Sequence, residues 1–450
     1  MNYKKNVLLF NIIFLLCLLV ANYIFPVKVA DKLGFRSISI LADVQVDSTL
    51  DIEKNNETKA NSPKVTKENN AVKDHITTNG LVNSAGDKHA ISTFLKALSE
   101  QKKFKNKKVR IAYFGDSFIE GDLITHDLRA LLQNEFGGDG VGFMPVTSIS
   151  AGSRTSITQS FSKDWEDINF KSDKKATENL FLSGHTYYAG PASWVNFKGV
   201  KESHLDSFTN VQVLYGPSKL NETEFSIQIN GKEQKLQPHQ FFNSSLINLE
   251  KTKAVQISIK NSSIPLYGFV FESNTGIFVD NFSFRGISGV ELDNFKMDFL
   301  QQIQKQHPYD LLIIHYGPNL LFNSKLVDFS WYQKKMDLVL RKIRSAFPQT
   351  SILLISTADK GAKYDGKWMT EKGVLPLIET QYDLALKNNM DFFNLYNGMG
   401  GNNSMVDWAE QTPSLSNKDY THVNIRGAKR IAEIIYSSII KEFNNYLKLD

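Results

Sequence analysis

The chain has 450 residues, of which 42% are hydrophobic and 12% aromatic, a composition typical of a folded protein with a large buried core. Its 52 basic and 47 acidic residues leave a formal charge of only +5, too weak and too dispersed to indicate a nucleic-acid partner. The single cysteine, Cys17, excludes an internal disulfide and a metal site built on cysteines.

The N-terminal segment, residues 1–27, is expected to anchor the chain in a membrane. Lys4 and Lys5 precede an uncharged apolar run of 19 residues, from 7 to 25, which is long enough to span a bilayer. A cleaved signal peptide is the alternative, but its apolar region would be shorter and would end at a site with small residues. We expect the anchor to lie in a bacterial inner membrane, with the following domain in the periplasm; secretion after signal cleavage is the alternative.

Residues 28–88 are predicted to form a flexible tether. From about Asp43 the sequence turns polar and has few large apolar residues whose burial would offset the entropy lost on ordering. Order is expected to resume at "AISTFLKALSEQ", where apolar residues recur at helical spacing.

Two parts of the remaining chain, residues 89–149 and 282–450, alternate short apolar runs with amphipathic helical patterns. The strand-like runs are "VRIAYF", "DLLIIHY", "SILLIS" and "DFFNLY", and a last helix is expected from about Ile425. Continuous apolar runs between helices indicate a parallel sheet covered on both faces, so the fold class is α/β, doubly wound.

Residues 150–281 show a different pattern and interrupt this alternation. Period-two runs such as "NVQVLYG" and "AVQISIK" are separated by Gly, Pro, Asn and Lys turns. The segment is therefore predicted to be a β-sandwich inserted into the α/β domain.

A serine stands in a tight turn between a predicted strand and a predicted helix. In "AYFGDSF" the apolar run ends at Gly115, so Ser117 would lie at the carboxyl edge of the sheet, where open α/β folds bind ligands. Ser117 is a candidate nucleophile, although a serine that only caps a helix would look the same locally.

The loop before the last helix offers the other two groups that a nucleophilic serine needs. In "DYTH", Asp419 precedes His422 by three residues. A base removes the serine proton, and a carboxylate fixes the tautomer of the base and stabilises its charged form. Such a pair also occurs as a helix cap, but its position after the last strand brings it back to the edge that carries Ser117.

Two further segments follow strand-like runs and end at the same edge. In "RGISGVEL", Gly289 offers an unhindered backbone N–H, and in "HYGPNLL", Asn319 offers a side-chain amide. Both are donors for a developing oxyanion. Each has a simpler explanation, as a turn glycine or a capping asparagine, but all of these segments in this order point to one site.

The blocks "GDSF", Gly289, "GPN" and "DYTH" resemble the four blocks of the GDSL, or SGNH, hydrolase superfamily. The resemblance implies that Ser117 is the nucleophile and first oxyanion donor, that Gly289 and Asn319 are the other donors, and that Asp419 and His422 complete the triad. It implies no metal and no organic cofactor.

Two more segments, "FGGDGVGFMP" and "MGGNNSMVDWAE", resemble the subgroup that contains peptidoglycan O-acetylesterases, which also carry a β-sandwich insert. The sequence departs from the family at two places. Pro318 and Leu320 flank Asn319 where the usual block reads Gly-Thr-Asn-Glu, which raises the question of how that loop is braced. Phe118 stands where many relatives carry a polar residue, so the substrate contacts are expected to differ.

Several other residues are expected to be structural. His126 falls in the helix after Ser117, His307 in a turn before a strand, and His315 at the end of a buried strand. The aromatic residues of the insert are candidates for a sugar-stacking platform, but core packing is the expected role for most of Trp194, Tyr215, Phe241 and Phe242.

The expected function is that of an exported serine esterase which removes O-acetyl or other small acyl groups from a cell-envelope polysaccharide such as peptidoglycan. Its partners would be this acylated glycan and the membrane, through the N-terminal helix. Two alternatives stay open: a polysaccharide O-acetyltransferase that uses the same triad, and a non-catalytic glycan-binding or assembly protein.

Overall fold

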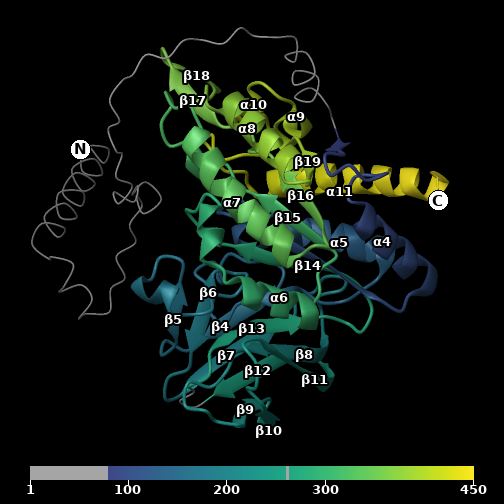
Figure 1. Cartoon of the computed structure of the whole chain (residues 1–450), viewed down its shortest axis with the longest axis vertical. Helices are drawn as coiled ribbons and strands as arrows, with labels where there is room; N and C mark the ends of the chain where they lie inside the picture. The colour runs from purple at the N-terminus through teal and green to yellow at the C-terminus, as the bar shows by residue number, and fades with distance from the viewer. Residues whose placement is uncertain (1–79, 260–262, 450) are drawn as a thin grey trace, which may run out of the picture. The chain divides into compact units, whose positions relative to one another are not determined.

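The computed structural model describes residues 80–259 and 263–449 (Figure 1). The predicted anchor and most of the predicted tether lie outside these residues. Within the described ranges, no helix is both long enough and apolar enough to cross a membrane.

The centre of the α/β domain is a six-stranded sheet with the strand order β1-β19-β16-β15-β2-β14. Neighbouring strands are parallel except β1, which pairs antiparallel with β19. Every residue of β15 is buried, as expected for a strand covered on both faces. The strands are β1 (Leu81–Val82), β2 (Lys108–Gly115), β14 (Gly276–Ser283), β15 (Leu311–His315), β16 (Ser351–Ile355) and β19 (Asp391–Phe393).

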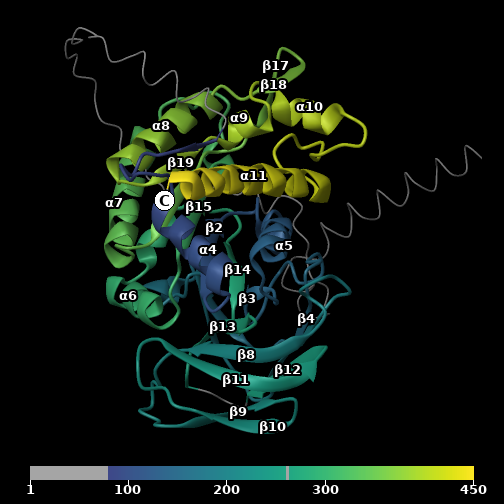
Figure 2. The same ribbon diagram turned by 90° about the vertical axis from the view of Figure 1, so that its right-hand side faces the viewer.

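Helices cover both faces of this sheet, which confirms the predicted α/β fold with a parallel core. On one face α4 (Ser92–Phe104), α5 (Thr125–Phe136) and α11 (Ile425–Leu449) contribute to one apolar cluster. On the other face α6 (Met297–Gln306), α7 (Ser330–Ala346) and α8 (Val374–Lys387) contribute to a second cluster. Figure 2 shows the two groups of helices on opposite sides of the strands.

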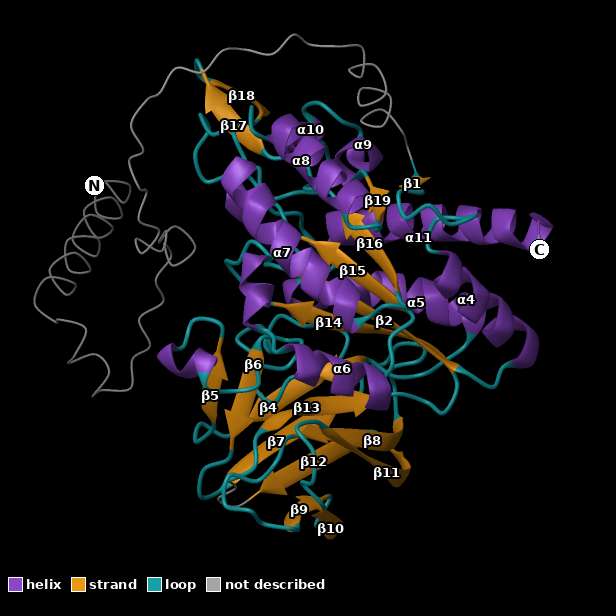
Figure 3. Ribbon diagram, viewed as in Figure 1, coloured by secondary structure: helices purple, strands orange, loops and turns teal. Residues whose placement is uncertain are grey.

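The insert consists of two antiparallel sheets with the orders β10-β9-β12-β7-β4 and β11-β8-β13-β6-β5, and β3 pairs with β13. Apolar side chains of both sheets, such as Val195 and Val213, share one buried cluster. Figure 3 shows these strands gathered below the α/β domain. They are β3 (Gly142–Met144), β4 (Thr158–Phe161), β5 (Glu166–Asn169), β6 (His185–Tyr188), β7 (Ser193–Lys198), β8 (Phe208–Tyr215), β9 (Phe225–Ile229), β10 (Lys232–Leu236), β11 (Asn243–Thr252), β12 (Ala254–Ile259) and β13 (Leu266–Phe271).

The boundaries of the insert differ from the predicted 150–281. Strand β3 already belongs to the insert, because it pairs with β13, whereas β14 belongs to the α/β sheet, because it pairs in parallel with β2. Both are short apolar strands, and which sheet such a strand joins depends on contacts distant in sequence. The sandwich strands therefore run from Gly142 to Phe271.

The fold also begins before residue 89, the predicted end of the tether. Leu81 and Val82 pair with β19, and the carboxylate of Asp391 accepts hydrogen bonds from the backbone N–H groups of Ser84 and Ala85. These partners lie some 300 residues further along the chain, so the polar local composition gave no sign of them.

The segment after Gly289 forms a short 3-10 helix, η4 (Val290–Asn294), which α6 follows. The strand expected over "DFFNLY" ends at Phe393, where the side chain of Asn394 caps α9 (Leu395–Met399) by accepting the N–H of Asn397. A hairpin of β17 (Gly361–Tyr364) and β18 (Lys367–Thr370), which the sequence analysis did not predict, follows β16.

Candidate active site

Ser117 lies in the turn after β2, at the carboxyl edge of the parallel sheet. The turn requires Gly115, because a Cβ atom there would lie 2.8 Å from the side chain of Ile119 and 3.1 Å from the carbonyl oxygen of His315. The next element is a short 3-10 helix, η2 (Glu120–Asp122), whose N-cap is Ile119, and the N-cap of α5 is Ile124. Ser117 therefore caps neither helix, and its hydroxyl is available for another partner.

That partner is His422. The Oγ of Ser117 lies 3.0 Å from Nε2 of His422, and Nδ1 of His422 lies 2.8 Å from Oδ2 of Asp419. When Nδ1 carries the hydrogen and donates a hydrogen bond to Asp419, Nε2 presents the lone pair that accepts the hydrogen of the serine hydroxyl. The structure thus brings together three predicted residues that are up to 305 positions apart in sequence.

Asp419 is held in its ionised form. Its Oδ1 accepts the backbone N–H groups of Thr421 and His422, both at 3.0 Å. Partial burial opposes ionisation, but these bonds and the one from the His422 ring outweigh it and hold the pKa of Asp419 below its usual value. The carboxylate is therefore charged at neutral pH and can stabilise a protonated His422.

Tyr420, which lies between Asp419 and His422, fixes the loop that carries both residues. Tyr420 has a left-handed backbone, with φ of 54°, and its carbonyl oxygen accepts the N–H of Gly361 at 2.7 Å. Its ring stacks on Trp368 of the β17–β18 hairpin, and its hydroxyl donates to Glu410. A backbone held in this sparsely populated region needs such external contacts.

Gly289 and Asn319 lie on the loops after β14 and β15. Gly289 has φ of 93°, and a Cβ atom there would lie 2.7 Å from the ring of Tyr316, so only glycine fits. The side-chain amide of Asn319 donates to Oδ2 of Asp116 and to the carbonyl oxygen of Ile287, both at 2.9 Å. Asn319 thus ties the residue before Ser117 to the segment that leads into Gly289.

The three candidate oxyanion donors differ in whether they already donate a hydrogen bond. Among the described residues, the backbone N–H groups of Ser117 and Gly289 donate no hydrogen bond, so both are open to a negatively charged oxygen. Both amide hydrogens of Asn319 already have acceptors. Asn319 can donate to an oxyanion only if it shares or exchanges one of these contacts.

The loop around Asn319 is braced without the usual flanking residues. Gln381 of α8 donates to the carbonyl oxygen of Tyr316 at 2.7 Å, and the ammonium group of Lys360 donates to the carbonyl oxygen of Leu321. Gly317 lies so close to Thr357 that a Cβ atom would approach its side chain to 2.3 Å. These contacts come from α8 and from the loop after β16, and Pro318 and Leu320 point into the core, where both are buried.

Asp116 belongs to the site, although the sequence analysis did not single it out. Its carboxylate is fully buried and accepts the backbone N–H of Phe118 at 2.9 Å as well as the amide of Asn319. Burial raises the pKa of Asp116 to about 6, and the nearby His422 and the two hydrogen bonds limit the rise. The only sign in the sequence is an acidic residue placed between the glycine and the serine of the turn.

A buried ion cluster supports the segment just after Ser117. Asp122 accepts a bidentate hydrogen bond from Arg129 of α5, at 2.9 and 2.8 Å, and forms an ion pair at 3.3 Å with Arg154 from the insert. Although burial opposes it, the two guanidinium groups hold the pKa of Asp122 far below its usual value. Gly121 and Asp122 both have positive φ, so this cluster holds a strained turn beside Ser117.

The remaining histidines have other partners. His126 lies 2.8 Å from Glu202, His307 is buried near Asp280, and His315 is buried with its Nδ1 3.0 Å from the hydroxyl of Tyr113. Burial lowers the pKa of His315 to about 3, so this ring is neutral. The structure does not bring any of the three into the hydrogen-bonded group formed with Ser117.

The aromatic residues of the insert divide between core and surface. Tyr215 and Phe242 are buried in the apolar clusters, whereas Trp194 is half-buried and Phe241 is 53% exposed. Tyr215 and Phe242 are therefore core residues and do not form a sugar platform.

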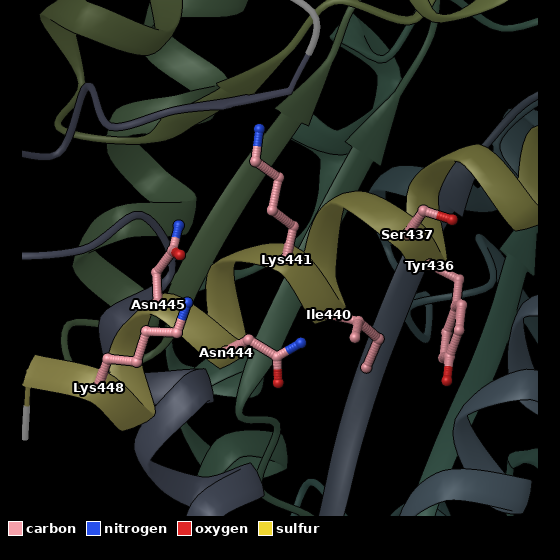
Figure 4. Close-up of a pocket in the computed structure, with 7 residues that line it drawn as sticks. All are labelled: Tyr436, Ser437, Ile440, Lys441, Asn444, Asn445 and Lys448. Atoms are coloured by element: carbon pink, nitrogen blue, oxygen red, sulfur yellow. The ribbon is translucent and has the colours of Figure 1, made fainter.

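An open hollow of about 450 Å³ lies along the C-terminal half of α11 (Figure 4). Tyr436, Ile440 and Lys441 are among its lining residues. The triad lies at the other end, just before the N-terminus of α11, so the hollow is separate from the site around Ser117.

Comparison with known proteins identifies the fold. No protein-family model and no curated protein matches the chain. A solved peptidoglycan O-acetylesterase matches 81% of this chain and 99% of its own, with a TM-score of 0.67 and 20% sequence identity. A salicylyl-acyltransferase matches 65% of this chain and 96% of its own, with a TM-score of 0.29 and 13% identity. A family two carbohydrate esterase from Cellvibrio japonicus matches 65% of this chain and 99% of its own, with a TM-score of 0.27 and 9% identity.

The last two TM-scores are too low to compare folds. The match with the peptidoglycan O-acetylesterase covers both the α/β domain and the insert, because it spans most of both chains. In fold, the chain is therefore similar to this peptidoglycan O-acetylesterase.

Proposed function

We propose that the chain is a serine esterase that removes O-acetyl groups, or other small acyl groups, from a cell-envelope polysaccharide. The observation that carries the proposal is the hydrogen-bonded series Ser117–His422–Asp419, with distances of 3.0 and 2.8 Å. It lies at the edge of the sheet where two backbone N–H groups are open to an oxyanion. A capping serine would need none of these partners.

The chemistry follows from this geometry. His422 takes the proton of Ser117 as its Oγ attacks the ester carbonyl carbon, and the carbonyl oxygen becomes an oxyanion. The N–H groups of Ser117 and Gly289 stabilise this charge, and Asn319 joins them when it exchanges one of its present contacts. The oxyanion then reforms the carbonyl group, the bond between the acyl carbon and the sugar oxygen breaks, and His422 gives its proton to that oxygen, so that the sugar leaves as a hydroxyl compound and an acyl-Ser117 intermediate remains.

Hydrolysis of the intermediate repeats these steps with water. His422 removes a proton from the water molecule, which attacks the acyl carbon, and the free acid leaves as Ser117 regains its proton. Asp419 keeps His422 oriented throughout and remains charged. The proposed steps use only these side chains and water.

Support for the substrate class comes from outside the triad. The solved structure of similar fold is described as a peptidoglycan O-acetylesterase, and this chain has the same two-part organisation of an α/β domain with a sandwich insert. We propose an acetylated glycan of the cell envelope as substrate, and no nucleic acid as partner.

The location is also part of the proposal. Residues 1–27 would anchor the chain in a bacterial inner membrane, and the polar residues after them would let the domain reach an immobile polymer in the periplasm. Membrane fractions washed with carbonate should retain the full chain. Release of a shortened soluble form would instead indicate a cleaved signal peptide.

The activity is tested with a protein that begins at Gly80, given acetylated peptidoglycan, and with free acetate and acetylated acceptor sugar measured separately. We expect free acetate in excess. Transfer of acetyl groups to added glycan with little free acetate would make the protein an acyltransferase. If neither product forms, and an activated acetate ester is not hydrolysed, the protein is not an esterase.

A further inference from the structure

The β17–β18 hairpin exposes apolar side chains next to the proposed active site. Trp368 and Met369 are 37% and 46% exposed, although most large apolar side chains of the α/β domain are buried. The hairpin follows β16 and therefore projects from the edge of the sheet that carries Ser117. Figure 2 shows it at the end of the domain away from the sandwich, beside α10 (Ser404–Glu410).

Trp368 contacts the loop that carries Asp419 and His422. Its ring stacks on Tyr420 with the centroids 4.0 Å apart and the planes inclined by 22°. The same loop is fixed by Gly361, whose N–H donates to the carbonyl oxygen of Tyr420. One face of the indole thus rests on the loop that positions the catalytic base.

The strand register adds a cation beside the indole. Lys363 is paired directly with Trp368 across the hairpin, so both side chains leave the ribbon on the same face. Lys363 is exposed. A flat aromatic ring with a neighbouring ammonium group combines apolar contact area with a hydrogen-bond donor.

A second exposed ring lies on the loop after Asn319. Phe322 is 58% exposed, and the loop is joined to the hairpin because the hydroxyl of Tyr364 donates to the carbonyl oxygen of Ser324 at 3.2 Å. Lys363 and Trp368 form one surface of the hairpin, whereas Met369 and Tyr364, which contacts the loop of Phe322, leave the hairpin on its opposite face. Exposed apolar surface of this kind is typical of binding sites.

We propose that the surface formed by Lys363 and Trp368 is a subsite that binds the glycan strand beside the acylated sugar, with one sugar ring stacked on Trp368 and Lys363 donating to a ring substituent. The inference rests on the proposed function and specifies how the polymer is held. A sugar ring presents C–H groups on its flat face, which suits an aromatic ring supported from behind. A lipid surface is the less suitable partner, because the stack on Tyr420 holds the indole flat instead of letting it insert.

The test compares kcat/KM on acetylated peptidoglycan with kcat/KM on 4-nitrophenyl acetate for Trp368→Ala and Trp368→Phe. We expect the ratio of polymer to small-ester activity to fall about fivefold in Trp368→Ala, the scale of one aromatic contact, through a higher KM for the polymer. Trp368→Phe should recover most of the ratio. Phe104→Ala is the matched control, because Phe104 is 58% exposed at the end of α4, on the opposite edge of the sheet.

Three results would overturn the inference while the proposed function stands. The first is an equal loss of kcat/KM on both substrates in Trp368→Ala, which would mean that Trp368 only supports Tyr420. The second is an unchanged KM of Trp368→Ala for the polymer. The third is co-sedimentation of the protein with phosphatidylglycerol vesicles that is lost in Trp368→Ala. If the unaltered protein hydrolyses neither substrate, the proposed function itself fails, and the subsite fails with it.

Discussion

Asp116 couples the charge of one buried carboxylate to the geometry of the oxyanion donors. It accepts the amide of Asn319, and burial raises its pKa to about 6. The carboxylate is therefore mostly charged at neutral pH, at a cost in stability, and in that form it is the best acceptor for Asn319. Such a balance between stability and activity is common at functional sites.

The raised pKa of Asp116 predicts how the stability of Asp116→Asn differs from that of the unaltered protein as the pH changes. Because the folded-state pKa is raised, the folded protein holds more protons than the unfolded chain between about pH 4 and 6, so the stability contributed by Asp116 falls as the pH rises through this range. The variant lacks this titration. The difference in unfolding free energy between variant and unaltered protein should shift in favour of the variant by about 2 kcal/mol from pH 4 to pH 7. Urea denaturation at both pH values measures it, and parallel stability curves would contradict the assignment.

Asn319 is expected to act in the transition state. Asn319→Ala should lower kcat on an activated acetate ester by about a hundredfold or more, the scale of one lost oxyanion donor, with little change in KM. Asn323→Ala is the control, because Asn323 lies on the same loop and is exposed. An unchanged kcat would mean that the contacts of Asn319 with Asp116 and Ile287 are purely structural.

At the scale of elements, a second buried ion pair, besides that of Asp122 with Arg154, joins the insert to the sheet. Arg110 of β2 donates a bidentate hydrogen bond to Glu272, the residue after β13, with distances from 2.8 to 3.1 Å. Glu272, Asp280 and His307 offer atoms within 4.8 Å of one another, but the carboxylate of Glu272 is already paired with Arg110. The group therefore acts as an ionic tie between the two domains.

Breaking this tie should destabilise the protein. Glu272→Gln leaves the Arg110 guanidinium buried without its counter-charge, so the unfolding free energy should fall by about 3 to 5 kcal/mol. Burial disfavours the charge of Glu272, but Arg110 outweighs it and lowers the pKa to about 2, so this stabilisation is present above about pH 4.5 and is lost as the pH falls towards 2. Denaturation of the exposed control Glu233→Gln should match the unaltered protein, and an equal midpoint for Glu272→Gln would contradict the tie.

Much of the parallel sheet could be predicted because its strands are continuous apolar runs bounded by turn residues, as in β15 and β16. The places that differed are decided by distant contacts. Strand β14 looks locally like the sandwich strand β13 before it, yet its parallel pairing with β2 places it in the other sheet. Leu81 stands in a polar segment, yet it pairs with Phe393 of β19 and packs against the apolar cluster of α4, α5 and α11.

The site was predictable where a residue has a chemical signature and a position at a strand end, as for Ser117, His422 and Asn319. It was not predictable where a role depends on burial. Asp116 is an ordinary acidic residue in the sequence, and only the structure shows that its carboxylate has no solvent. Trp368 belongs to a hairpin whose register and stacking partner the sequence did not indicate.

At the scale of the whole molecule, the folded domain includes residues 80–87, which were predicted to belong to the polar tether. A protein that begins at Lys88 loses β1, and the buried carboxylate of Asp391 loses the N–H groups of Ser84 and Ala85 while it keeps that of Ile91. It should unfold at a lower urea concentration than a protein that begins at Gly80. Its unfolding free energy should be lower by about 1 to 3 kcal/mol. Equal stability would show that the domain begins after residue 87.

The proposed mechanism depends on Ser117 as the nucleophile, because its Oγ lies 3.0 Å from Nε2 of His422 at the carboxyl edge of the sheet. The most direct test is the rate at which folded Ser117→Ala hydrolyses 4-nitrophenyl acetate, with its melting temperature measured alongside. We expect an almost unchanged melting temperature and a rate at least about a thousandfold lower, because no other group takes over the attack. Full activity in a folded Ser117→Ala protein would contradict the esterase mechanism.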